Sequence, residues 1–331
     1  MKPSTVSLAL ETLISTQRPA FLWGPPGVGK SALVAQCARR HNLQLIDVRA
    51  VLLDPVDLRG LPHVNGDNRA HWCTPEFLPR EGAGILFLDE LNAAPQLVQA
   101  ACYQLILDRK LGEYSLPEGW TVLAAGNRET DRAVTSRMPS ALANRFVHLS
   151  VDVDLEDWTA WALGAGIAIE VIAFLRFRPA LLHAFDPSKN EKAFPTPRSW
   201  EMVSDLLLSD PPEVVRYDLY SGCVGDGAAA ELLGFLRIWE SLPNPDAVLL
   251  NPATAPVPSV QDGQGATLYA LCGALARKAG PGNADNFFAY ANRLPAEFSV
   301  LLAKDVLTRS PAMANTRGYI GWAAAHADTL I

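Results

Sequence analysis

Gly24-Pro25-Pro26-Gly27-Val28-Gly29-Lys30-Ser31 is the stretch that decides the fold. It matches the pattern GxxxxGK[ST] of a phosphate-binding loop. An apolar run precedes it at residues 21–23 and a helical pattern follows it, which is the context that the motif requires. Glycines let backbone N–H groups close around phosphate oxygens, and the N-terminus of the following helix adds partial positive charge. The sequence therefore predicts a nucleotide site formed by residues 24–31 and Ala32.

Two side chains of this loop predict ATP and Mg²⁺ as the cofactors. Lys30 would neutralise the β- and γ-phosphates, and Ser31 would ligate Mg²⁺. The alternative is a glycine-rich turn that binds nothing. At ordinary glycine usage a chance match to this pattern is rare, so the nucleotide site is the stronger interpretation.

A pair of carboxylates follows the apolar run 85–88. Asp89 and Glu90 would therefore lie at the carboxyl end of a buried strand, where ligands bind in open α/β sheets. Asp89 would hold Mg²⁺ through water, and Glu90 would polarise the attacking water as a general base. Taken alone, an apolar strand ending in Asp-Glu is also a common surface turn. The preceding phosphate loop favours the catalytic interpretation.

Up to about residue 150, short apolar runs alternate with helical patterns, which is typical of a parallel sheet covered by helices. The expected strands are 21–23, 45–48, 85–88, 122–125 and 147–149. After residue 150 the pattern becomes helical, with segments at 155–163, 167–177, 199–208 and 228–239. The fold class is therefore α/β: a three-layer αβα core with a parallel sheet, an all-α lid and a helical C-terminal extension.

Three domains are expected along the chain: a nucleotide-binding α/β core at 1–150, a helical lid at 151–245 and a helical extension at 246–331. The proline-rich stretch 243–258 is interpreted as a linker between the last two. Three or four helical segments would then run from about Ala266 to the end.

Composition restricts the partners and the compartment. The formal net charge of -7 lacks the basic footprint that binding to a phosphate backbone usually needs. The five cysteines show no CxxC spacing, which favours free thiols in a reducing cytosol. No apolar stretch has the length of a membrane span, so we expect a soluble cytoplasmic protein. His63, His71 and His148 lack a second ligand at a matching spacing, so we expect surface positions or strand packing rather than metal binding.

Together, residues 24–31, the pair Asp89-Glu90, and Asn127 after the strand 122–125 resemble an AAA+ ATPase. The order of the pieces resembles the MoxR branch of that class over roughly residues 1–240. The resemblance implies that Asn127 is the sensor that orients the attacking water. The alternative for Asn127 is an ordinary strand-ending turn residue.

Two predicted hairpins strengthen the resemblance to the MoxR branch. Residues 54–60 precede a hairpin formed by 62–64 and 70–72 around the turn 65–68. In that branch a hairpin at this place faces the ring pore. Residues 109–114 with 117–120 resemble the extra hairpin that precedes the sensor.

The resemblance also implies two catalytic arginines. Arg145 stands where the family places its arginine finger, which a subunit donates to the nucleotide of its neighbour, and Arg137 is the second candidate. Arg198, after Pro197 at the start of a lid helix, would reach back to the nucleotide as the second sensor. Solvated surface arginines are the alternative for all three. Asn92 departs from the family pattern, which commonly has an arginine shortly after the second acidic pair.

What the resemblance implies for function is a homo-oligomeric ring, a hexamer, that hydrolyses ATP to remodel or mature a partner protein or complex. The partner would carry a von Willebrand factor A domain. A DNA-directed AAA+ motor or loader is the main alternative, and the acidic charge argues against it. Salt-dependent DNA binding would favour that alternative. A nucleotide-binding switch that rarely hydrolyses is a third possibility, which Asp89, Glu90 and Asn127 disfavour.

Overall fold

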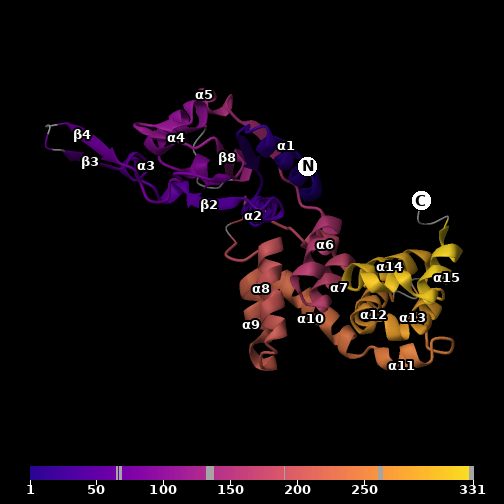
Figure 1. The fold of residues 1–331 in the computed structure, drawn as a ribbon. Coiled ribbons are helices and arrows are strands. Elements are labelled where there is room, and N and C mark those ends of the chain that lie inside the picture. The colour runs from indigo at the N-terminus through magenta and orange to yellow at the C-terminus, as the bar shows by residue number, and fades with distance from the viewer. Residues whose placement is uncertain (65, 67–68, 132–137, 190, 260–263, 328–331) are drawn as a thin grey trace. The chain divides into compact units, whose positions relative to one another are not determined.

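The computed structural model describes residues 1–64, 66, 69–131, 138–189, 191–259 and 264–327. The chain divides into two compact units (Figure 1). Unit 1 comprises Met1–Asp154 with Asp186–Asn190, and unit 2 comprises Leu155–Phe185 with Glu191–Ile331. Among the described residues, no helix combines the length and the apolar character needed to cross a bilayer. The division of the second half into a lid and an extension at residue 246 stays a prediction.

A five-stranded parallel sheet is the centre of unit 1. Its order is β2-β5-β8-β1-β9, and this confirms the predicted α/β fold. The strands are β1 Ala20–Trp23, β2 Gln44–Arg49, β5 Ala83–Asp89, β8 Gly119–Gly126 and β9 Val147–Ser150. All five predicted strands are present. Their apolar runs are continuous because helices cover both faces of the sheet.

Alternation along β5 shows the three layers. Ile85 and Phe87 belong to the core that includes α1 (Pro3–Ser15) and α2 (Lys30–Arg40). Leu86 and Leu88 belong to the opposite core, which includes α4 (Gln96–Asp108). Successive side chains of a strand point to opposite faces, so this one strand contributes to both cores. Helix α1 was not predicted from the sequence.

The first predicted hairpin is present as β3 (Leu61–Val64) paired antiparallel with β4 (Ala70–Cys73), after the short helix α3 (Pro55–Arg59). All residues of the two strands are exposed, and the hairpin extends from the body of unit 1 (Figure 1). Of the predicted turn 65–68, only Gly66 belongs to the described residues. Its orientation toward a ring pore stays a prediction.

The second hairpin is smaller than expected. It consists of β6 (Lys110–Leu111) and β7 (Tyr114–Ser115). Trp120, predicted as part of it, lies instead in the central strand β8, because its indole is fully buried in the core. The Glu113 carboxylate joins the two hairpins by accepting a hydrogen bond from the Trp72 N–H at 3.4 Å.

Unit 2 is helical in all its described elements. It contains α6 Leu155–Ala165, α7 Ile169–Phe177, α8 Pro197–Leu208, α9 Glu213–Val224, α10 Asp226–Glu240, α11 Pro245–Leu250, α12 Gly265–Lys278, α13 Ala284–Ala291, α14 Ala296–Arg309 and α15 Arg317–Ala325. The four helices predicted at 155–239 are present, and α9 was missed. Short 3₁₀ turns complete the chain: 50–52, 91–93 and 129–131 in unit 1, and 179–181, 281–283 and 311–315 in unit 2.

The linker predicted at 243–258 is partly wrong. Helix α11 occupies 245–250, with Pro245 in its first turn and the Asn244 side chain capping it. Val248 and Leu249 are buried against α12 and α13, so this segment is part of a hydrophobic core. Proline is tolerated in the first turn of a helix, where its missing N–H costs nothing, and a proline-rich composition therefore did not exclude a helix here.

A buried ion pair connects the early and late helices of unit 2. Arg176 on α7 forms a bidentate pair with Asp305 on α14, and the side chains are 10% and 1% exposed. We expect Asp305→Ala to lower the free energy of unfolding by about 3–5 kcal/mol, because it leaves a buried guanidinium without its counter-charge. Chemical denaturation of the full chain measures this change.

The matched control is Glu231→Ala, which removes the partner of Arg178 in an exposed pair of the same unit. Its expected cost is at most about 1 kcal/mol. Equal costs for the two variants would contradict a special role for the buried pair.

Candidate nucleotide site

The phosphate loop connects β1 to α2. Strand β1 ends at Trp23, and α2 begins at Lys30 with Gly29 as its N-cap. Gly27 and Gly29 have φ angles of 76° and 93°, a region that glycine enters without strain. The loop therefore surrounds the N-terminus of an eleven-residue helix, where backbone N–H groups and the helix dipole favour a bound anion.

Lys30 joins three parts of the site. Its Nζ donates to the carbonyl oxygens of Gly24 at 2.7 Å and Pro25 at 3.1 Å, and to Asn127 Oδ1 at 3.0 Å. Asn127 follows β8, which lies beside β1 in the sheet, and this neighbourhood brings the two side chains together. The predicted sensor thus contacts the predicted phosphate-binding lysine.

Ser31 and Asp89 also meet. The Ser31 hydroxyl donates to Asp89 Oδ2 at 2.7 Å, although the residues are 58 positions apart in the chain. A hydroxyl and a carboxylate are the hard oxygen donors that Mg²⁺ prefers, so the pair fits this ion. Both side chains offer only oxygen atoms as ligands.

Glu90 is the residue directly after β5. Its N–H donates to Asp89 Oδ1 at 2.9 Å, and its φ of 56° is unusual for a residue with a side chain. This left-handed conformation ends the strand and starts the 3₁₀ turn Leu91–Ala93. The two carboxylates therefore leave the backbone at a sharp bend rather than along an extended strand.

Asn92 holds the backbone of Asn127 and was not predicted to do so. It is 1% exposed, and its Nδ2 donates to the Asn127 carbonyl oxygen at 2.8 Å. Gly126 permits this approach, because a Cβ there would lie 1.9 Å from Asn92 Oδ1. The sequence showed Asn92 only as a departure from the family pattern. Its location between two strand ends makes it a positioning residue for Asn127.

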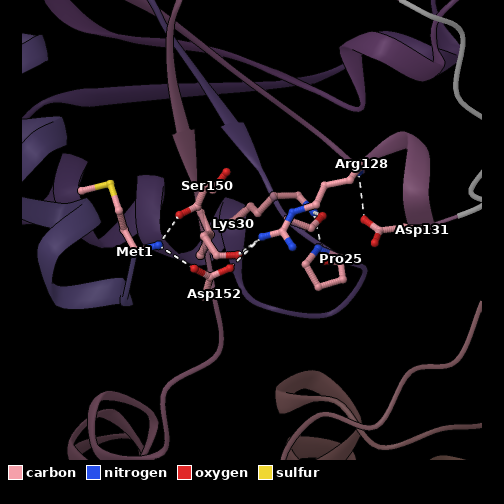
Figure 2. A network of polar contacts seen from close by, with 9 residues as sticks. Met1, Pro25, Lys30, Arg128, Asp131, Ser150 and Asp152 are labelled. Atoms are coloured by element: carbon pink, nitrogen blue, oxygen red, sulfur yellow. Dashed lines mark hydrogen bonds and ion pairs between the residues drawn. The ribbon is translucent and has the colours of Figure 1, made fainter.

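The residue after Asn127 ties the same loop to the end of the sheet. Arg128 donates to the Val151 carbonyl oxygen at 3.2 Å. It also donates to Asp152 Oδ1 at 2.7 Å, as Figure 2 shows. The ammonium group of Met1 contacts the other oxygen of Asp152 at 2.7 Å. Hydrogen bonds from this ammonium and from Arg128 lower the pKa of Asp152. Asp152 is therefore ionised at neutral pH, and the network links the loop of Asn127 to the segment that leads into α6.

Arg145 lies in the turn between α5 (Ser140–Ala143) and β9. Its guanidinium stands 5.8 Å from the centre of the Tyr103 ring on α4, a distance typical of a cation–π contact. Arg137, the second candidate for the finger, lies outside the described residues. The role of Arg145 toward a neighbouring subunit stays a prediction.

Arg198 lies in unit 2, in the first turn of α8, and is exposed. Pro197 occupies the first turn as predicted, and Thr196 caps the helix. The Ser199 N–H donates to Thr196 Oγ1 at 3.0 Å, and the Thr196 N–H donates to Ser199 Oγ at 2.7 Å. This capping box fixes the start of the helix that carries Arg198. The sensor role of Arg198 stays a prediction.

The family comparison agrees with this geometry. Residues 19–146 match the model of the AAA domain, dynein-related subfamily. The match begins just before β1 and ends one residue after Arg145, so the phosphate loop, Asp89-Glu90 and Asn127 all lie within the matched residues.

One curated relative and two solved structures are similar to the chain. Midasin of Giardia intestinalis is 33% identical over 164 residues, which are 46% of this chain and 3% of midasin. The chain thus spans about 3% of the length of that relative. NtrX from Brucella abortus in complex with ATP has 17% identity and a TM-score of 0.42, with 92% of this chain and 67% of NtrX covered. A point mutant of Thermotoga maritima RuvB has 18% identity and a TM-score of 0.39, with 71% of this chain and 69% of RuvB covered.

Proposed function

We propose that this chain binds ATP with Mg²⁺ at its AAA domain and hydrolyses ATP to ADP and phosphate. The observation that carries the proposal is the convergence of four side chains: two from the first turn of α2, one from the end of β5 and one directly after β8. Lys30 contacts Asn127, and Ser31 contacts Asp89, within a loop whose shape suits phosphate. These contacts join residues that are far apart in the chain, and a glycine-rich turn without a ligand does not require them.

Each side chain has a defined task in the proposed reaction. Lys30 binds the β- and γ-phosphate oxygens in place of its present contacts with the Gly24 and Pro25 carbonyls. Ser31 and Asp89, whose side chains meet, would hold Mg²⁺. Bound Mg²⁺ would offset the negative charge that develops on the phosphate oxygens. Glu90 accepts a proton from the attacking water, and Asn127 orients that water.

The proposed working form is a homo-oligomeric ring, a hexamer, in the cytoplasm. Arg145 completes the active site of the neighbouring subunit, and Arg198 contacts the nucleotide from the lid. Two features support an assembly of the MoxR type: the exposed β3–β4 hairpin, and the second hairpin that precedes Asn127. The ring would remodel or mature a partner protein or complex, with a von Willebrand factor A domain protein as the partner.

Calorimetric titration of the full chain with ATP and Mg²⁺ tests the proposal. We expect binding by the wild type, and an affinity at least about tenfold lower for Lys30→Ala, because one charge-assisted contact to phosphate is lost. Lys304→Ala removes an exposed lysine of α14 and is the matched control, with the wild-type affinity expected. Absence of binding by the wild type, or equal binding by Lys30→Ala, would reject the nucleotide site.

A further inference from the structure

Trp23 and His148 form a hydrogen-bonded pair between the neighbouring strands β1 and β9. Trp23 is the last residue of β1 and directly precedes the phosphate loop. Its indole Nε1 donates to His148 Nδ1 on β9 at 2.8 Å, and the two ring centres are 5.9 Å apart. Strand register places His148 opposite Phe21, so this bond runs diagonally across the strand pair.

The hydrogen bond from Trp23 determines which nitrogen of His148 can donate the next one. An indole N–H can only donate, so His148 Nδ1 must accept, and the neutral imidazole carries its proton on Nε2. That nitrogen lies 2.8 Å from the carbonyl oxygen of Ala143, the last residue of α5. Two consecutive hydrogen bonds therefore run from the end of β1 through His148 to the end of α5.

This second bond ends on the turn that carries Arg145. The Ala143 carbonyl also accepts the Phe146 N–H at 3.2 Å, and the Arg145 N–H donates to Leu142 at 3.1 Å. Phe146 packs edge to face against Phe21 of β1, with ring centres 5.4 Å apart. The turn is thus held on both sides of Arg145 by residues that contact β1.

We call these two consecutive hydrogen bonds the Trp23–His148 relay. Its β1 end lies next to the phosphate loop, whose contacts with Lys30 would change on nucleotide binding. Lys30 now holds the carbonyls of Gly24 and Pro25, the first two residues after Trp23. Once Lys30 turned to phosphate oxygens, both carbonyls would lose this partner. The backbone directly after Trp23 is therefore the part of the loop that loses its lysine contact on nucleotide binding.

We propose that the Trp23–His148 relay positions Arg145 according to the nucleotide that the same subunit holds. The inference rests on the proposed function, in which Arg145 acts on the neighbouring subunit. Trp23 and His148 are positioning residues in this scheme and do not touch the reacting atoms. In each subunit, the relay connects the phosphate loop to the turn that carries Arg145, which acts on the neighbouring subunit.

A mixing experiment with full-length chains tests the relay. Acceptor subunits carry Arg145→Ala and keep an intact active site, whereas donor subunits carry Glu90→Gln and keep Arg145. Mixing them restores ATP turnover at the acceptor sites. Adding Trp23→Phe to the donor keeps an aromatic ring but removes the N–H, and we expect the restored turnover to fall by about fivefold, the rate equivalent of one hydrogen bond. The same change in the acceptor leaves restored turnover near that of the parent mixture.

Further variants separate the relay from simple destabilisation. A chain that fails to fold loses function in both placements, whereas the relay predicts a loss in the donor alone. Donor His148→Ala should reproduce the effect, and donor Trp161→Phe, which removes an indole N–H on α6, should not. With an intact relay, a donor whose nucleotide binding is weakened by Ser31→Ala, which keeps the Lys30 contacts to Gly24 and Pro25, should restore less turnover than the Glu90→Gln donor. With Trp23→Phe the two donors should become equal.

The outcomes distinguish the two proposals. If the parent mixture restores no turnover, the trans role of Arg145 fails, and the relay fails with it. If the parent mixture restores turnover and donor Trp23→Phe or His148→Ala leaves it unchanged, the relay alone is overturned.

Discussion

Replacement of Arg145 by alanine is expected to lower steady-state ATP turnover by about 10³-fold or more, because an arginine finger stabilises the charge on the transferred phosphoryl group. The structure places Arg145 in a turn outside the strand ends that gather Lys30, Asp89 and Asn127. ATP affinity should change far less than turnover, since the subunit's own phosphate loop is intact. Turnover and calorimetric affinity, measured on the same preparations, provide the comparison.

Protein concentration provides the second measurement on Arg145. If the guanidinium acts in a neighbouring subunit, wild-type turnover per subunit should fall on dilution toward the Arg145→Ala value. Arg309→Ala, at the exposed end of α14, is the control and should keep wild-type turnover. Wild-type turnover by Arg145→Ala at every concentration would remove the finger assignment. Arg137 would then be the residue to replace.

Replacement of Glu90 by glutamine is expected to lower the rate of hydrolysis by about 10²–10⁴-fold, the range of a lost general base. The amide has nearly the shape of the carboxylate but cannot accept the proton of water. Binding of ATP and Mg²⁺ should persist, because Lys30, Ser31 and Asp89 are unchanged. Single-turnover hydrolysis, read beside calorimetric affinity, separates the chemical step from binding.

A matched carboxylate tests the specificity of this result. Glu81→Gln, at an exposed position just before β5, should hydrolyse ATP at the wild-type rate. Hydrolysis by Glu90→Gln at the wild-type rate would mean that another group accepts the proton. Failure of Glu90→Gln to bind ATP would instead show a structural role for the bend at this residue, whose φ is 56°.

The Glu90→Gln chain also serves the search for a partner. Held in the ATP state, it should retain a bound partner that the wild type releases after hydrolysis. Under the proposed function, a purified von Willebrand factor A domain protein would be retained with ATP and released with ADP. Equal retention in both nucleotide states would separate binding from the ATPase cycle.

The amino-acid sequence by itself determined the phosphate loop, the five strands and the acidic pair. Parallel strands buried on both faces are continuous apolar runs, and the phosphate loop is a contiguous motif, so a local pattern identifies both. The helix start at Pro197 is equally local, because proline suits the first turn of a helix. The errors fell where composition misleads: α11 lies in a proline-rich segment, and Trp120 belongs to β8 rather than to a hairpin.

Only the tertiary structure decided which of these pieces meet. Asn92 reaches Asn127 across 35 positions, Arg128 reaches Asp152 across 24, and Trp23 reaches His148 across 125. Each contact depends on the order of strands in the sheet, β5 beside β8 and β1 between β8 and β9. Periodicity reports how a residue relates to its own strand or helix, whereas strand order arises from packing of the whole core. The positioning residues therefore became visible only once the strands were in place.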